Sequence, residues 1–261
     1  MLTLSIIVAI VFYLIAAGLQ WRILTGRSPS AGPRIKIIGL IAFAAHTYAT
    51  YLDLHRPAGI YLDFFSVGSL IGWLVAALVL LSSLRQMIDN LFVGVFPVAA
   101  LALIFNLFSL DTNIAKDYDS ALVIHILISI LAYSIFTLAA FQAILLARQD
   151  HQLKHHRTRG LIKSLPPLQT MEKLLFEMIW TGFILLTASL LTGALVFEDL
   201  FAQHLIHKTV LSIFAWLLYV VLLIGRHLLG WRSHRAIRWT VGGFIVLMLS
   251  FFGSKFVLEL L

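Results

Sequence analysis

The chain has 261 residues, of which 61% are hydrophobic and 12% are charged, against roughly 45–50% and about 25% in ordinary soluble domains. This composition excludes a soluble globular protein and indicates an integral membrane protein. The absence of cysteine excludes a dithiol relay, a thiolate-bound iron–sulfur cluster and a structural disulfide.

Eight apolar runs follow one another along the sequence, and each is long enough to approach the ~20 residues of a membrane-spanning helix. They lie at about 3–20, 37–52, 65–83, 91–108, 121–146, 175–197, 209–225 and 239–258. The runs lack the alternating polarity of a transmembrane β-barrel, and a helix satisfies every backbone amide in lipid. The sequence therefore predicts an all-α, polytopic membrane bundle of about eight helices, with residues 1–261 forming a single transmembrane domain.

The 19 Lys and Arg residues are concentrated in alternate loops, which indicates the orientation of the spans. The basic loops follow the first, third, fifth and seventh runs, and cytoplasmic loops retain positive charge. We therefore expect both termini outside and a multi-pass protein of the bacterial inner, cytoplasmic membrane. The formal net charge of +7 is accounted for by this topology and by attraction to anionic lipid, so we expect the lipid bilayer and not nucleic acid as a partner.

No motif of a known catalytic mechanism is present. The sequence has no glycine-rich phosphate loop, no paired-carboxylate motif and no serine with a plausible base. Carboxylates in the runs, such as Asp89, Glu177 and Glu259, lie near their ends, which argues against a proton pump with carriers at mid-depth. We therefore expect a protein that is not an enzyme.

Histidines in and beside the spans are the candidate functional residues. His46 lies near mid-depth of the second run, His125 lies about two turns into the fifth, and His207 opens the seventh. Neutral imidazole ligates haem iron, and two histidines on facing helices can hold a haem between them. An alternative for His46 is a hydrogen bond to a neighbouring helix, and His204 with His207 could be ordinary interfacial residues.

Four segments carry a resemblance to a known family. They are residues 125–133, MEKLLFEMIWTGFILLTASLLTGALVF at 171–197, HKTVLSIFAWLLYVVLLIGRHLLGWRSHRAIRW at 207–239, and FFGSKFVLELL at 251–261. They resemble the cytochrome c assembly family of CcsA and HemX, and most of all its YpjD-like inner-membrane branch. The resemblance implies haem held by histidines near the outer face and in the membrane, beside a tryptophan-rich outer motif.

This sequence matches the family pattern in part. His125 falls at the position of the first outer haem histidine, and His207 stands with Lys208 where the family has Pro-Lys. The segment 193–208, at the place of the tryptophan-rich motif, contains no tryptophan and has Phe197 and Phe201 instead. Ile224 replaces the second membrane histidine, and no histidine follows FFGSKF. These departures argue against haem attachment to cytochrome c but are compatible with haem binding.

The resemblance therefore implies a haem-binding protein in haem handling or in cytochrome c and respiratory-complex biogenesis. Its cofactor would be haem b, with His125, His207 and His46 as iron ligands in that order of preference, and its partners would include other membrane biogenesis or transport proteins. One alternative is an accessory subunit of a membrane complex or ion transporter, without haem. Another is an independent transporter with a mid-depth cavity near residues such as Thr47, Ser66, Ser69 and Asn106.

Overall fold

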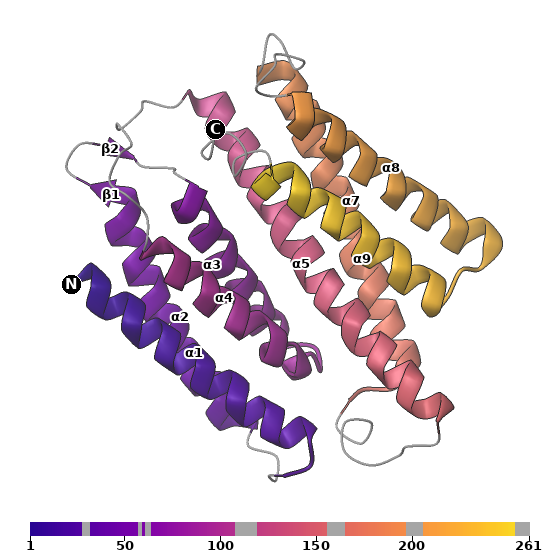
Figure 1. Cartoon of the computed structure of the whole chain (residues 1–261), viewed down its shortest axis with the longest axis horizontal. Coiled ribbons are helices and arrows are strands. Elements are labelled where there is room, and N and C mark those ends of the chain that lie inside the picture. Colours follow the sequence, from indigo (N-terminus) through magenta and orange to yellow (C-terminus); the bar gives the residue numbers. More distant parts are fainter. Residues whose placement is uncertain are drawn as a thin grey trace. The chain divides into compact units, whose positions relative to one another are not determined.

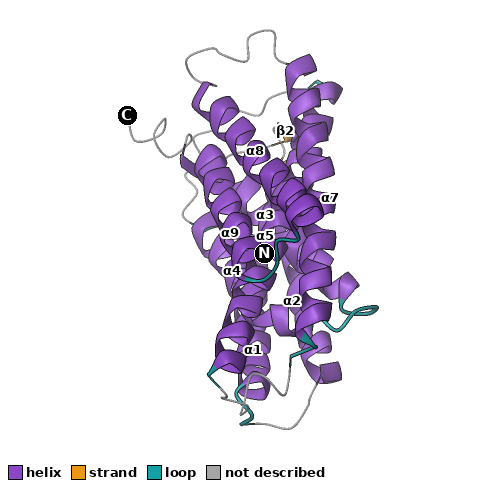
Figure 2. Cartoon of the chain, turned by 90° about the vertical axis from the view of Figure 1, so that its right-hand side faces the viewer, coloured by secondary structure: helices purple, strands orange, loops and turns teal. Residues whose placement is uncertain are grey.

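The computed structural model describes residues 1–27, 32–56, 59–60, 64–107, 119–155, 165–196 and 206–253, and helices dominate these segments (Figure 2). The chain divides into two compact units. The first contains α1 to α4, coloured indigo to magenta in Figure 1, and the second contains most of α5 together with α7, α8 and α9, coloured pink to yellow.

The first unit consists of α1 (Leu2–Leu24), α2 (Gly32–Leu54), α3 (Phe64–Ser82), the 3₁₀ turn η1 (Asp89–Leu91) and α4 (Phe92–Asn106). Between α2 and α3, the two-residue strands β1 (His55–Arg56) and β2 (Gly59–Ile60) pair antiparallel. The second unit consists of α5 (Ser120–Lys154), α7 (Leu168–Val196), α8 (Ile206–Leu229), α9 (His234–Met248) and the π-helical turn η2 (Leu249–Gly253).

The predicted all-α fold is confirmed: within the described residues, eight helices are long and apolar enough to cross a membrane. Their ends extend beyond the apolar runs. The helix α5 continues through polar residues to Lys154, because a helix can leave the hydrocarbon layer without losing its backbone hydrogen bonds. The helix α7 starts at Leu168, directly after Pro166 and Pro167, since proline fits readily just before a helix or in its first turn.

Four helices close a ring in the first unit, because α1 packs on α2 and α4, and α3 packs on the same two helices. Aromatic rings fill the centre: Tyr13 lies 5.2 Å from Phe96, and Phe96 stacks on Phe92 at 4.7 Å between ring centroids. Gly39 lets α2 approach these rings, since a Cβ atom there would lie only 2.8 Å from Cζ of Phe96. The interior of this unit is therefore closely packed.

An aromatic pair between two glycines holds the second unit together. The rings of Phe136 on α5 and Tyr219 on α8 stack at 4.1 Å between centroids. A Cβ atom at Gly182 of α7 would lie 3.0 Å from the Phe136 ring, and one at Gly243 of α9 would lie 2.8 Å from the Tyr219 ring. Four helices thus meet at one level, and side chains at either glycine would displace a ring that has no free side.

Replacing Gly243 by valine tests this packing. Gly243→Val inserts a branched side chain against the Tyr219 ring, and overpacking of this kind costs about 1–3 kcal/mol. We expect a lower midpoint of thermal unfolding in mild detergent. Gly242→Val is the matched control, because a Cβ atom at Gly242 meets nothing within 4 Å and the two variants share the same change in helix propensity. Equal midpoints for the two variants would contradict the proposed packing.

Orientation in the membrane can be tested on the natural cysteine-free background. Ser120, at the start of α5, and Gln86, in the turn after α3, are both exposed, and the positive-inside rule places Ser120 outside and Gln86 in the cytoplasm. We expect a membrane-impermeant maleimide to label the Ser120→Cys variant on intact spheroplasts, and to label Gln86→Cys only after permeabilisation. The reverse pattern would invert the topology.

Candidate functional site

His125 lies in the second turn of α5, and its ring reaches across to α7. The nitrogen Nδ1 lies 3.1 Å from the carbonyl oxygen of Ser189 and 3.2 Å from Oγ1 of Thr192. The Thr192 hydroxyl donates its own proton to the carbonyls of Ala188 and Ser189, so it can only accept at His125. Both partners of Nδ1 are therefore acceptors, which places the ring proton on Nδ1 and leaves the lone pair on Nε2.

The helix α7 is shaped to receive this ring. A Cβ atom at Gly193 would lie 3.0 Å from Cε1 of His125, so a larger residue would push the imidazole away. One turn deeper, the hydroxyl groups of Ser129 and Ser189 lie 2.7 Å apart, and Ser129 also donates to the carbonyl of His125. Small and hydroxyl-bearing residues of this kind let membrane helices approach closely and bond to each other.

This arrangement suits His125 to bind a metal through Nε2. Histidines that ligate metals usually donate the other ring nitrogen to a carbonyl or carboxylate, which fixes the tautomer and the ring orientation. The hydrogen bond from Nδ1 of His125 to the Ser189 carbonyl fixes the imidazole in this way. The part of the chain that the structure describes contains no group of three or more His, Cys, Asp or Glu residues that could hold a metal ion.

His207 lies in the first turn of α8, and its side chain is exposed. The next residue, Lys208, is close enough to His125 to interact with it electrostatically. The backbone there is anchored from η2, because the Ser250 hydroxyl donates to the Lys208 carbonyl at 2.8 Å. The structure thus brings the start of α8 near the His125 end of α5, while the imidazole of His207 points to the surface. His204, Phe197 and Phe201 lie outside the described residues.

His46 has a different environment, in the interior of the first unit. Its side chain is completely buried, Nδ1 lies 3.3 Å from the hydroxyl of Tyr13, and Nε2 lies 3.2 Å from the hydroxyl of Ser69. The Tyr13 ring also packs edge-on against the imidazole at 5.8 Å. Both ring nitrogens are therefore engaged, and His46 would have to give up a hydrogen bond to ligate iron. In this arrangement it joins three helices.

Asp53 is a buried polar residue that the sequence analysis missed. It is 3% exposed, and its Oδ2 accepts hydrogen bonds from Ser66 at 2.7 Å and from Nδ2 of Asn106 at 3.1 Å. The spacing could have revealed it, because Asp53 follows His46 by two helical turns and shares its face of α2. Ser66 and Asn106, which could have lined a transport cavity, instead hold this carboxylate.

The two other residues considered for such a cavity also serve helix packing. Ser69 bonds to His46, and the Thr47 hydroxyl donates to the Phe43 carbonyl while it accepts from Nε1 of Trp73. Packed interfaces between membrane helices use the same residue types as polar cavities. Ser69 and Thr47 therefore make the contacts that are expected where two membrane helices pack together.

The sequence of this chain is similar to the sequences of known proteins. The family model of the cytochrome C assembly protein matches residues 35–261. The chain belongs to the cytochrome c assembly protein family, and it is a multi-pass membrane protein. The match starts within α2 and covers α5, α7 and α8, which carry His125 and its surroundings.

Two relatives show how far the similarity extends. The inner membrane protein YpjD of Escherichia coli strain K12 is 31% identical over 228 residues, which cover 86% of each chain. An uncharacterized 28.8 kDa protein in the nifR3-like 5′ region of Azospirillum brasilense is 29% identical over 140 residues, 53% of this chain and 52% of that one. No solved structure matches the chain. The predicted family and its YpjD-like branch are thus confirmed.

Removing the hydroxyl of Tyr13 tests the role of His46. Tyr13→Phe leaves Nδ1 of the buried imidazole without this partner, and an unsatisfied buried polar group costs about 1–3 kcal/mol. We expect a lower midpoint of thermal unfolding than for Tyr48→Phe, which removes the same hydroxyl from a side chain that is 50% exposed on α2. Identical midpoints would show that the Tyr13 bond to His46 contributes nothing to stability.

Proposed function

We propose that this chain is a haem-binding protein of the bacterial inner membrane, not itself an enzyme, that takes part in haem handling or in cytochrome c and respiratory-complex biogenesis. The family match over residues 35–261 supports the biogenesis role. The similarity to the inner membrane protein YpjD of Escherichia coli supports the location. The group would be haem b, which supplies a redox-active iron when it is bound.

The observation that carries this proposal is the orientation of His125. Its ring is fixed by the Ser189 carbonyl and lies over Gly193, so that Nε2 carries the lone pair. An ionisable imidazole within a membrane span is also energetically costly, so its presence indicates a functional role.

Two histidines are candidates for the second iron ligand. His207 is preferred, because it lies beside Lys208, which interacts with His125, and because its exposed imidazole has room to turn. His46 is third, since both of its nitrogens already take part in hydrogen bonds. Histidines on two neighbouring helices can hold a haem between them.

One observation favours a second function, an accessory subunit of a membrane complex without haem. His46 is an example within this chain of a membrane histidine that is used for packing alone. If His125 is used in the same way, the protein has no chromophore and its role is to stabilise a partner. Glutamine, which can still donate to the Ser189 carbonyl, would then replace His125 without effect.

The test is a reduced-minus-oxidised absorption spectrum, with haem quantified, on full-length protein purified in mild detergent from haem-replete cells. We expect a sharp α-band at near-stoichiometric haem. Both His125→Ala and His125→Gln should abolish or shift this band, because neither side chain ligates iron as imidazole does. His207→Ala should shift it, and His46→Gln should leave it in place.

His227→Ala is the matched control, since His227 is exposed near the end of α8 and its loss should not change the spectrum. Wild-type protein without haem, even after reconstitution, would overturn the proposal, as would an unchanged band in both His125 variants. Protein that lacks haem, copurifies with a membrane partner and tolerates His125→Gln would establish the accessory role instead.

A further inference from the structure

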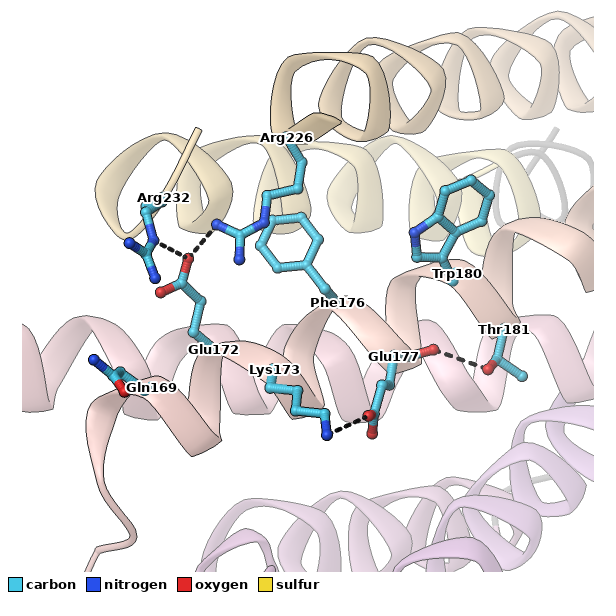
Figure 3. A pocket seen from close by; sticks show the side chains of 9 residues that line it. All are labelled: Gln169, Glu172, Lys173, Phe176, Glu177, Trp180, Thr181, Arg226 and Arg232. Atoms are coloured by element: carbon cyan, nitrogen blue, oxygen red, sulfur yellow. Dashed lines mark hydrogen bonds and ion pairs between the residues drawn. The ribbon is translucent and has the colours of Figure 1, made fainter. Parts of the chain in front are cut away.

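A groove of about 680 Å³ lies between the start of α7 and the end of α8, far along α7 from His125. Figure 3 shows its side chains. Charged groups stand at one end and aromatic rings follow deeper along α7. The residues that line the groove include Glu172, Lys173, Phe176, Trp180, Arg226 and Arg232.

A buried ion pair forms the base of the charged end. The Glu172 side chain is 6% exposed, and its Oε1 accepts from Nη1 of Arg226 at 2.7 Å. The same nitrogen donates to the carbonyl of Trp231 at 3.1 Å, and the guanidinium lies 4.4 Å above the ring of Phe176. Arg226 is therefore held in place by a carboxylate, a carbonyl and an aromatic ring.

The charges do not cancel in this groove. Nε of Arg232 lies 3.5 Å from the same Glu172 oxygen, so a single carboxylate faces two guanidinium groups, which converge on it in Figure 3. Each guanidinium has five N–H donors in a fixed fork, and the contacts of Arg226 and Arg232 with the described residues above use few of them. Lys173 and Glu177 also line the groove, and their exposed contact at 3.8 Å is worth little, so three cations stand against two carboxylates. The charged end thus retains positive charge and donors that suit a phosphate group.

The aromatic end lies deeper along the helix. Trp180 follows Glu172 by two turns, or ~12 Å at 1.5 Å per residue, and its side chain is 50% exposed. Phe176 lies between them on the same face. The polar headgroup layer of a bilayer is only about 5–8 Å thick on each side, so the groove runs from headgroup depth into the acyl layer. A free phosphate ion would use the charged end alone, whereas a phospholipid uses both.

The membrane face agrees with this ligand. Arg226 and Arg232 belong to one of the basic loops that the positive-inside rule assigns to the cytoplasm, and basic pockets between helices on that side bind anionic headgroups. We propose that this groove binds an anionic phospholipid of the cytoplasmic leaflet. Arg226 and Arg232 hold its phosphate group, and its glycerol and upper acyl region lie along Trp180. This site does not depend on haem binding.

Tryptophan fluorescence provides the test, because Trp180 lies in the groove. The full chain is reconstituted into zwitterionic vesicles that contain increasing fractions of acyl-brominated phosphatidylglycerol or acyl-brominated phosphatidylethanolamine. The Trp180 signal is the difference between wild type and Trp180→Phe. We expect half-maximal quenching of this signal at a several-fold lower fraction of the anionic lipid than of the zwitterionic one.

The variant Arg232→Gln removes one cation and leaves the pair of Glu172 with Arg226 intact. It should raise the fraction of anionic lipid needed for half-maximal quenching about fivefold. Arg238→Gln is the control, because Arg238 is an exposed arginine of α9 outside the groove with the same change in charge. Equal quenching by the two lipids, or equal effects of the two variants, would overturn the proposal. Loss of the lipid preference on adding millimolar inorganic phosphate would also overturn it, in favour of a free phosphate site.

Discussion

The packing of aromatic rings on glycines is the constraint on which the second unit depends. Lipid gives helices no hydrophobic reason to associate, so close packing and interhelical hydrogen bonds must hold them. The Phe136 ring lies on Gly182, and the His125 ring lies on Gly193. His125 precedes Phe136 by eleven residues on α5, and Gly193 follows Gly182 by eleven residues on the antiparallel helix α7. Eleven residues are close to three turns, so both contacts lie on one face of α5 and one face of α7. The position of His125 therefore follows from the register that the aromatic pair fixes.

Much of the fold could be predicted from the sequence, because membrane spans are a local property. Long apolar runs gave the eight helices, and the segments around His125 and Gly230-Trp231 indicated the family. The environments of His125 and His46 could not be predicted, since both are lone histidines in apolar helices. Their difference comes from other helices: Ser189 offers His125 a carbonyl acceptor, whereas Tyr13 and Ser69 engage both nitrogens of His46. The hydrogen-bond partners of Asp53 could not be predicted either, because they lie on α3 and α4.

The two units use their polar groups in different ways. In the first unit, His46 and Asp53 lie on one face of α2 and bond to side chains of neighbouring helices, so that polar groups in the interior act as links between helices. In the second unit, Tyr133, Gln142 and Trp216 also bond between helices, but two further polar clusters lie near the ends of α7. His125 meets Ser189 at one end, and Glu172 meets Arg226 at the other. The first unit is thus arranged as a scaffold, and the second presents chemical groups at both membrane faces.

The register between α5 and α7 also limits how the second unit can move. A shift of one helix by one turn along its axis would move both rings off their glycines at once. Neither ring would then reach the other glycine, because Gly182 and Gly193 are three turns apart. Rotation of either helix about its axis would do the same. The helix α8 is also tied to its neighbours at three levels, by Lys208 to Ser250 of η2, by Trp216 to Thr187 of α7 and by Arg226 to Glu172 of α7. The second unit therefore resists both sliding and tilting of its helices, which keeps the start of α8, with His207, in place relative to His125.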